Sequence, residues 1–143
     1  MKLMKPLLLL FVLLMVSGGN LISQEPWTSK ELMDPALLSN ILSNSKAEKP
    51  YIFNIGPLAN IKGATMIGST TNKKNLETLR VALSKISRDK IVVIYCGCCP
   101  FRSCPNVRPA FELMKEMKFT KPRLLNLPQN LKVNWMDYGY PME

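Results

Sequence analysis

The chain contains no histidine among its 143 residues. This absence excludes catalytic dyads in which a histidine is the general base, and it excludes every mixed Cys/His zinc pattern. Acidic residues are also scarce, 10 against 19 Lys and Arg, so the formal net charge is +9. The basic residues are scattered and form no runs interleaved with aromatics, so no nucleic-acid partner is expected. A small anionic substrate is compatible with this charge balance.

Cysteine is absent everywhere except in one short stretch, YCGCCPFRSCPNVRP, which starts at Tyr95. All four cysteines fall within nine residues of it: Cys96, Cys98, Cys99 and Cys104. An unbroken apolar run, residues 91–95, precedes them, as expected of a strand buried on both faces of a sheet. Thiols this close together can form a metal site, a disulfide staple, a redox pair, or one nucleophile with neighbours.

The N-terminus has the pattern of a secretory signal peptide over residues 1–23. Lys2 and Lys5 precede an apolar run over residues 6–16, and small and polar residues follow. The run is shorter than the roughly 20 residues that span a bilayer, although an uncleaved anchor is the alternative. We therefore predict export, to the periplasm or beyond the cell, with no stable membrane insertion after cleavage. Disulfides are stable in such compartments.

Residues 24–143 have the length of a single domain and a net charge of about +7. Strands are predicted at 51–55, 64–67, 91–95 and 123–127, from short apolar runs bounded by turn residues. Helices are predicted around 30–33, after Pro35, at 75–86 and at 107–117, where apolar residues recur with helical spacing. A short helix and a turn are expected at the C-terminus. This alternation predicts an α/β fold with a parallel sheet. Four methionines are expected to fill the core: Met33, Met66, Met114 and Met117.

The residues from about 27 to 142 resemble a single rhodanese-like domain. The resemblance depends on the cysteine directly after the apolar strand, on Gly63-Ala64 before an apolar segment, on Trp135, and on the Gly-Tyr-Pro sequence at 139–141. It implies a central parallel sheet flanked by helices. It also implies a nucleophilic cysteine at a strand end, in a loop that wraps an anion at a helix N-terminus. That position is Cys96.

The resemblance implies sulfurtransferase activity through a persulfide on Cys96. The partners would be a small anionic sulfur donor and a thiol acceptor, which can be a protein thiol, and no cofactor is expected. Inward-pointing loop amides ahead of a helix are expected to lower the thiol pKa and to hold negative charge. Arg102 is the nearest candidate cation. The other residues expected around the substrate are Gly97, Cys98, Cys99, Phe101, Ser103 and Arg108.

Three alternatives concern the thiols. Cys96 and Cys99 have the C-x-x-C spacing of a thiol–disulfide redox pair. Cys104 can form a disulfide with Cys98 or Cys99 and staple the loop. The loop can also belong to a non-enzymatic module that binds copper(I) or a protein. A tetrahedral zinc cage is disfavoured, because such sites normally join two separated C-x-x-C knuckles and these cysteines all come from one loop.

The spacing of Cys96 and Arg102 is also similar to that of phosphatases, including those that share the rhodanese fold. Their loops need an unbroken row of backbone donors around a phosphate. Pro100 and Pro105 interrupt such a row because proline has no N–H, so this alternative is disfavoured.

Overall fold

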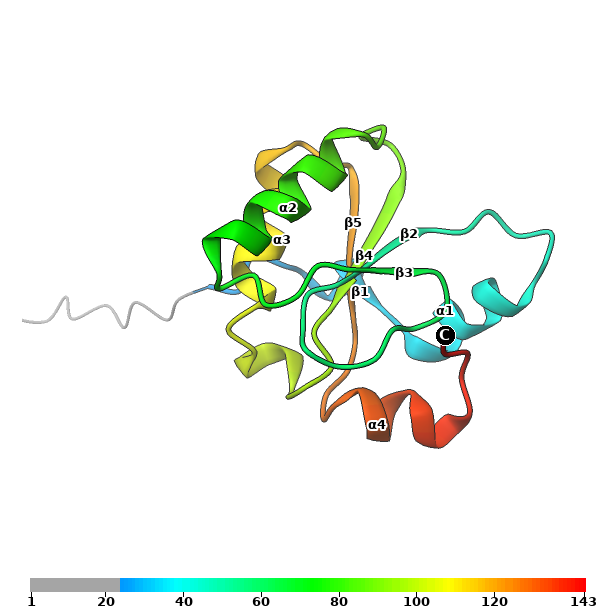
Figure 1. Ribbon diagram of the computed structural model, residues 1–143. Helices are drawn as coiled ribbons and strands as arrows, with labels where there is room; N and C mark the ends of the chain where they lie inside the picture. Colours follow the sequence, from blue (N-terminus) through cyan, green and yellow to red (C-terminus); the bar gives the residue numbers. More distant parts are fainter. Residues whose placement is uncertain (1–23) are drawn as a thin grey trace, which may run out of the picture.

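A computed structural model describes residues 24–143, and the predicted signal peptide lies outside the described residues. Five strands form one sheet in which every neighbouring pair is parallel, in the order β1-β5-β4-β2-β3 (Figure 1). The strands are β1 (Leu32–Met33), β2 (Tyr51–Asn54), β3 (Ala64–Met66), β4 (Ile91–Tyr95) and β5 (Lys121–Leu125). No helix within this described part is long and apolar enough to cross a membrane.

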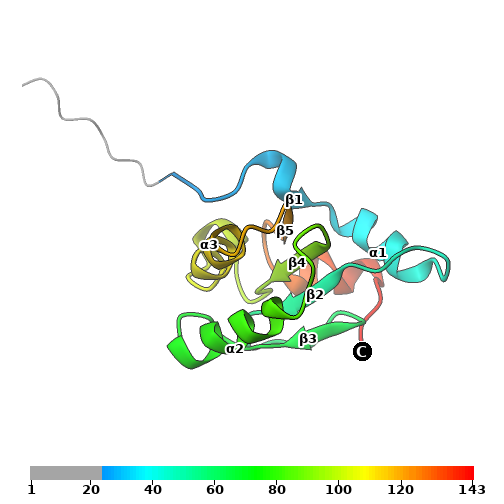
Figure 2. The same cartoon turned by 90° about the horizontal axis from the view of Figure 1, so that it is seen from above.

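Helices cover both faces of the sheet (Figure 2). One face carries α2 (Lys73–Ser84) and α3 (Val107–Glu116), and the other carries α1 (Pro35–Ser43) and the short α4 (Leu131–Asn134). Each face has its own apolar core, with Phe111 central to the first and Trp135 to the second. The prediction of an α/β fold with a central parallel sheet flanked by helices is confirmed.

The central strand β4, which leads into the cysteine loop, is buried on both of its faces. Val92 and Ile94 pack into the α2/α3 core, while Val93 and Tyr95 pack into the α1/α4 core. All four side chains are at most 1% exposed. The prediction of a strand buried on both faces is confirmed, and Cys96 directly follows its last residue.

The start of the domain differs from the sequence-based expectation. The helix predicted around residues 30–33 is a 3-10 turn, Ser29–Glu31, with a capping box between Thr28 and Glu31. The next two residues form β1, which pairs with Leu124 and Leu125 of β5. The capping box is a local feature, whereas the strand depends on a partner about 90 residues away in the sequence, which no local pattern shows.

Strand β5 begins at Lys121, two residues before the predicted strand, and contains Pro122. On one side Pro122 lies opposite Val92 of β4. On the other side β1 pairs only with Leu124 and Leu125, so at Pro122 that side of β5 is an edge. A proline is tolerated there because its missing N–H does not interrupt a ladder.

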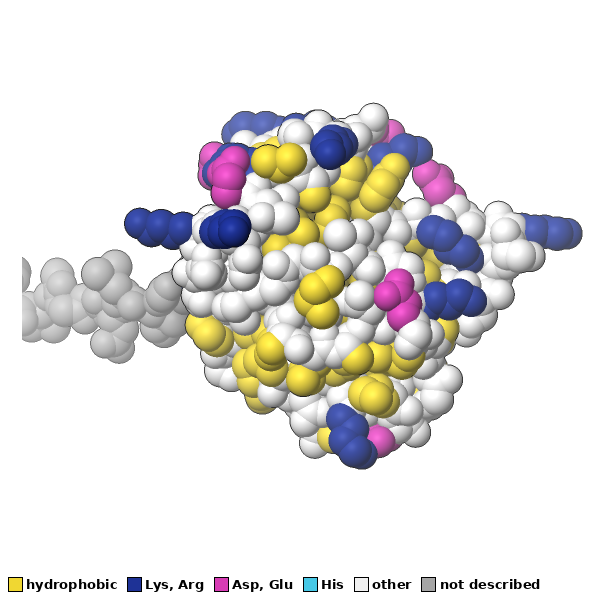
Figure 3. Space-filling view, viewed as in Figure 1, with side chains coloured by type: hydrophobic (Ala, Val, Ile, Leu, Met, Phe, Trp, Pro, Cys, Tyr) yellow, Lys and Arg dark blue, Asp and Glu magenta, His cyan; other side chains and the backbone are white. Residues whose placement is uncertain are grey.

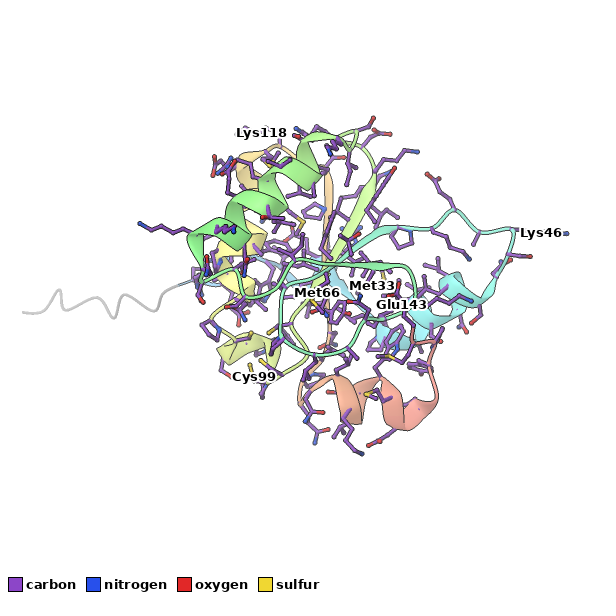
Figure 4. All side chains as sticks on the ribbon, in the orientation of Figure 1. Met33, Lys46, Met66, Cys99, Lys118 and Glu143 are labelled. Atoms are coloured by element: carbon purple, nitrogen blue, oxygen red, sulfur yellow. The ribbon has the colours of Figure 1, made fainter. Side chains whose placement is uncertain are left out.

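The expectation that all four methionines fill the core is wrong for Met66. Met33 and Met114 are buried, whereas Met66 lies on the edge strand β3 and is 47% exposed (Figure 4). An edge strand has no neighbour beyond it to cover its outer side. On the face drawn in Figure 3, Lys and Arg side chains lie singly or in small groups with Asp and Glu among them.

Candidate functional site

The loop over residues 96–106 joins the end of β4 to the start of α3, at the edge of the sheet where the parallel strands end (Figure 1). It contains a single 3-10 turn, Phe101–Ser103. Cys96, at its start, is 3% exposed and belongs to the α2/α3 core. The structure therefore places this thiol where the sequence predicted it, at the end of the central strand.

The loop folds back on itself and gathers its four thiols into one cluster. The four Sγ atoms all lie within 4.8 Å of one another, and all four cysteines are free. Cys98 Sγ lies 3.2 Å from Cys96 Sγ and 3.3 Å from Cys99 Sγ. Cys96 and Cys104 are buried, Cys99 is half-buried and Cys98 is exposed. Figure 4 labels Cys99 at the margin of the fold, on the outer side of this loop.

Cys96 is surrounded by hydrogen-bond donors. Donation from the Cys104 thiol is the largest influence that lowers the pKa of Cys96, to about 5, and burial acts in the opposite direction. The Asn106 side chain, the Cys98 thiol and the Cys98 backbone N–H lower the pKa further. Donors stabilise the thiolate more than the neutral thiol, so Cys96 is a thiolate at neutral pH.

The neighbouring thiols keep their protons for the same reason. Donation to Cys96 is the largest influence that raises the pKa of Cys104 above its ordinary value. The pKa of Cys98 is raised to about 12, first by the partial burial of the Cys98 sulfur and then by its donation to Cys96. The pKa of Cys96 is therefore lowered while those of Cys98 and Cys104 are raised, because the latter two thiols stabilise the Cys96 thiolate as proton donors.

Asn106 is a site residue that sequence reasoning misjudged. Its position directly before α3 predicts a helix cap, but its side chain makes no capping hydrogen bond. The side-chain amide is buried and donates to Cys96 Sγ at 3.4 Å, while its oxygen accepts from Ser69 Oγ at 2.6 Å and from the Thr71 N–H at 3.3 Å. The segment that leads into α2 therefore fixes the orientation of the donor amide. An asparagine just before a helix is ordinarily a cap, so the sequence carried no signal for this contact.

Gly56, just beyond β2, packs directly against Cys96. A Cβ at this position would lie 2.8 Å from Cys96 Sγ and closer still to the Cys96 carbonyl oxygen, so a larger residue cannot fit without movement. Asn54 is fully buried, and its Oδ1 accepts from the Gly56 N–H at 3.0 Å. In the sequence, Gly56-Pro57 indicated only that a strand ends there. Its contact with the nucleophile depends on β2 and β4 lying side by side.

Gly97 belongs to the framework of the loop. It has a φ of +79°, a backbone conformation that favours glycine, and a Cβ would lie 2.9 Å from Leu131 Cβ. Its carbonyl accepts a hydrogen bond from the Leu131 N–H at 2.8 Å. The contact links the first turn after Cys96 to the start of α4.

The expectation of a row of inward-pointing amides is wrong at three positions of the loop. The backbone N–H groups of Phe101, Ser103 and Cys104 donate to the carbonyl oxygens of Leu127, Pro100 and Phe101. These three N–H groups already donate to backbone carbonyls and therefore do not point toward a bound anion. The Cys98 amide does act on Cys96 as expected. Stabilisation of the thiolate therefore comes mainly from side chains.

Neither candidate cation forms a hydrogen bond to a cysteine within residues 24–143. Arg102 is 62% exposed, donates to both carboxylate oxygens of Glu25 at 2.7 and 2.8 Å, and lies over the Phe101 ring. Arg108 donates to the Gln24 carbonyl and lies over the Trp27 ring. Both arginines thus tie the loop and α3 to the N-terminal segment, and a role for Arg102 toward a substrate stays a prediction.

The last two residues expected around the substrate also have structural contacts. Phe101 is buried and meets the Trp27 ring edge-to-face at 6.0 Å, so it packs the loop onto the core. Ser103 is exposed, and its hydroxyl donates to the Pro100 carbonyl. The residues that pack against Cys96 Sγ or donate to it include Gly56, Cys98, Cys104 and Asn106.

Comparison with protein-family models and with curated proteins finds no match to this chain. Function is therefore inferred from the chemistry of the loop. A small, buried thiolate with protonated thiols around it is equipped to attack an electrophilic sulfur.

Proposed function

We propose that this protein is an exported rhodanese-like sulfurtransferase that carries sulfane sulfur as a persulfide on Cys96. The observation that supports it is the placement of Cys96 as a buried thiolate at the end of β4, with donors from Cys104, Asn106 and Cys98. The all-parallel sheet flanked by helices is compatible with the rhodanese-like fold.

In the first step the Cys96 thiolate attacks the outer sulfur of a donor such as thiosulfate. The S–S bond of the donor breaks, sulfite leaves with the electron pair, and a new S–S bond forms on Cys96. In the second step an acceptor thiolate attacks the terminal sulfur, and Cys96 leaves as a thiolate. Charge and electrons balance in both steps, so no separate oxidant or reductant is needed.

The donors around Cys96 fit this chemistry. The terminal sulfur of a persulfide carries the negative charge, one bond beyond Sγ, where the Cys98 thiol and the Asn106 amide can donate to it. Cys96 is 3% exposed, so a small donor fits better than a bulky one. The exposed Cys98 marks the side from which an acceptor approaches.

The test is an intact-mass measurement on reduced protein after incubation with thiosulfate or a small persulfide. We expect a gain of one sulfur atom in the wild type and none in Cys96→Ser. Cys99→Ser is the matched control, because it removes a loop thiol that makes no hydrogen bond to Cys96, and it is expected to gain the sulfur. No gain with any donor would reject sulfur transfer.

Arg102 needs a separate comparison, since its guanidinium is paired with Glu25. If Arg102 assists an anionic donor, Arg102→Gln lowers the rate of sulfur uptake, while Glu25→Gln frees the guanidinium and does not lower it. Equal rates in both variants and the wild type would limit Arg102 to tying the loop to the N-terminal segment.

The distance between Cys96 Sγ and Cys98 Sγ, 3.2 Å, favours a second candidate, thiol–disulfide exchange. Cys96 would attack a substrate disulfide and release one substrate thiolate. Cys98 would then lose its proton, attack the Cys96 sulfur of the mixed disulfide and release the second. The loop ends oxidised and the substrate reduced. The sequence suggested Cys99 as the partner, whereas the sulfur in hydrogen-bond contact with Cys96 at 3.2 Å is that of Cys98.

Mild oxidation followed by intact mass tests this candidate. A loss of two hydrogens that requires both Cys96 and Cys98, and that survives in Cys99→Ser, supports exchange through this pair. A loss that persists in Cys98→Ser would reject it.

A further inference from the structure

We infer that the four thiols of the loop form an all-sulfur binding site for a soft metal ion of the Zn²⁺ or Cu⁺ kind. This inference goes beyond sulfur transfer, because it uses several sulfurs of the cluster together and not Cys96 alone. It depends on the positions of the sulfur atoms and of the groups that donate to them.

The size of the cluster fits a metal. Zn–S bonds of about 2.3 Å in a tetrahedron place the sulfurs about 3.8 Å apart. The sulfur separations here start at 3.2 and 3.3 Å, and none exceeds 4.8 Å. Shifts of about 1 Å or less therefore convert the cluster into a coordination shell, and side-chain rotation in the exposed Cys98 and the half-buried Cys99 can supply part of them.

The sequence disfavoured a zinc site because all four cysteines come from one loop, but the path of this loop brings their sulfurs together. Gly97 has a φ of +79° directly after Cys96, and the chain bends at Cys98 and Cys99. The 3-10 turn Phe101–Ser103 follows, closed by the hydrogen bond from the Cys104 N–H to the Phe101 carbonyl. The loop thus returns Cys104 toward Cys96 and places its four sulfurs within 4.8 Å of one another.

The surroundings of the sulfurs resemble a second coordination shell. Asn106 donates to Cys96 Sγ through its side chain, and its backbone N–H donates to the Cys104 sulfur. The Cys98 backbone N–H donates to Cys96. Such N–H donors orient thiolate ligands and stabilise the charge that accumulates on them. Cys98 gives an ion access from solvent, and the buried pair forms the floor of the site.

The ligand set decides which ions fit. Sulfur ligands select soft or borderline ions and disfavour Mg²⁺ and Ca²⁺, which require oxygen. Zn²⁺ would use all four thiolates in a closed tetrahedral site, whereas Cu⁺ is satisfied by two or three. The two ions therefore share one site but differ in the number of cysteines they need.

The test is an anaerobic titration of the reduced full chain with Zn²⁺ and, separately, with Cu⁺, each in competition with a chromophoric chelator. We expect one ion per chain by native mass spectrometry. Co²⁺ used in place of Zn²⁺ should give the strong visible absorption of a tetrahedral thiolate site. Ser103→Ala is the matched control, since it alters an exposed residue of the same loop that offers no sulfur.

Cys98→Ser removes an exposed sulfur and is not expected to affect folding, which circular dichroism checks. It should weaken Zn²⁺ binding at least tenfold, while Cu⁺ binding survives on the remaining sulfurs. Binding of Cu⁺ alone also supports the site, with three sulfurs or fewer. The inference is overturned if neither ion binds at one per chain. It is also overturned if Zn²⁺ binds Cys98→Ser as tightly as it binds the Ser103→Ala control. Because sulfur uptake is measured without metal, the failure of one proposal is distinguishable from the failure of the other.

Discussion

At the scale of single residues, the four cysteines differ far more in chemistry than in sequence. Cys96 is the thiolate, while Cys98 and Cys104 donate to it and keep their protons. The lowered pKa of Cys96 requires no histidine or lysine, because thiols and an amide replace the cationic partner that commonly lowers a thiol pKa. Because only Cys96 has a lowered pKa, substitutions of its donors should change the reactivity of Cys96 in a predictable direction.

The first expectation concerns pH. A thiol alkylates as its thiolate, so the rate at Cys96 should be nearly constant above about pH 6. It should fall about tenfold per unit once the pH is below the pKa of about 5. An ordinary thiol would lose its reactivity below about pH 8.5. Alkylation with iodoacetamide, mapped by peptide mass spectrometry, measures the rate at Cys96 separately from the other three sites.

Asn106→Asp provides the companion variant. It keeps an oxygen that accepts from Ser69 and Thr71, but it replaces the amide that donates to Cys96 with a negative charge. Both changes disfavour the thiolate, so the midpoint of the alkylation profile should move to higher pH. An unchanged midpoint in this variant would show that Asn106 does not stabilise the thiolate.

Gly56→Ala tests the close packing behind Cys96. The added Cβ would lie 2.8 Å from Cys96 Sγ, so Cys96 or strand β2 must shift. Overpacking of this kind costs about 1–3 kcal/mol of unfolding free energy, measured by urea denaturation. Gly139→Ala is the comparison, since its φ of +68° is strained by alanine but its Cβ meets nothing within 4 Å. Alkylation of Cys96 should change in Gly56→Ala and not in Gly139→Ala.

At the scale of elements, the ends of helices and strands position the residues that surround the Cys96 sulfur. β4 delivers Cys96, the segment before α2 holds Asn106, and the bend after β2 places Gly56 against the sulfur. Each contact joins two elements that are distant in the sequence. The helices themselves are specified by local signals, of which the start of α1 is the clearest example.

We expect Asp34→Ala to destabilise α1. The Asp34 carboxylate accepts from the backbone N–H groups of Ala36 and Leu37 at 2.7 and 3.1 Å, ahead of Pro35 at the first helical position. Loss of such a cap costs about 1 kcal/mol, measured by chemical denaturation. Asp34→Asn keeps an acceptor and should retain most of the stability. Equal losses in the two variants would mean that charge, and not capping, is what Asp34 contributes.

At the scale of the whole molecule, the C-terminal segment covers one face of the sheet and returns to β3. Met142 forms a bridge with Ile61, and Glu143 accepts from the side chain of Asn60 and from the Gly63 N–H. Trp135 is fully buried in the α1/α4 core, and its Nε1 donates to the Pro141 carbonyl. This ring therefore links α4, the last turn and the sheet.

Trp135→Ala should cost about 3–5 kcal/mol of unfolding free energy, because it removes a large buried ring and leaves a cavity. Met136→Ala, in the same segment but 46% exposed, should cost less than about 1 kcal/mol. Urea denaturation of both variants measures the difference. A similar cost in the two would contradict the assignment of Trp135 to the core.

The sequence predicted the main elements because their patterns are local. The continuous apolar run at 91–95 has no polar residue to face water, and α2 and α3 repeat apolar residues with helical spacing. It did not predict β1, because a two-residue strand exists only through its pairing with β5. It missed Gly56 and Asn106 because their contacts with Cys96 form only when β2, β4 and the segment before α2 assemble.

The sequence by itself determined that a lone cluster of thiols, without histidine, follows a buried central strand, since composition and hydrophobic periodicity are properties of the chain alone. Only the tertiary structure decided how those thiols differ. Burial, the folding of the loop after Gly97 and the amide of Asn106 bring donors to Cys96, while Glu25 pairs with Arg102. A thiol pKa depends on the atoms within a few ångströms of the sulfur, and folding brings those atoms from the loop itself, with the segment before α2 holding Asn106 in place.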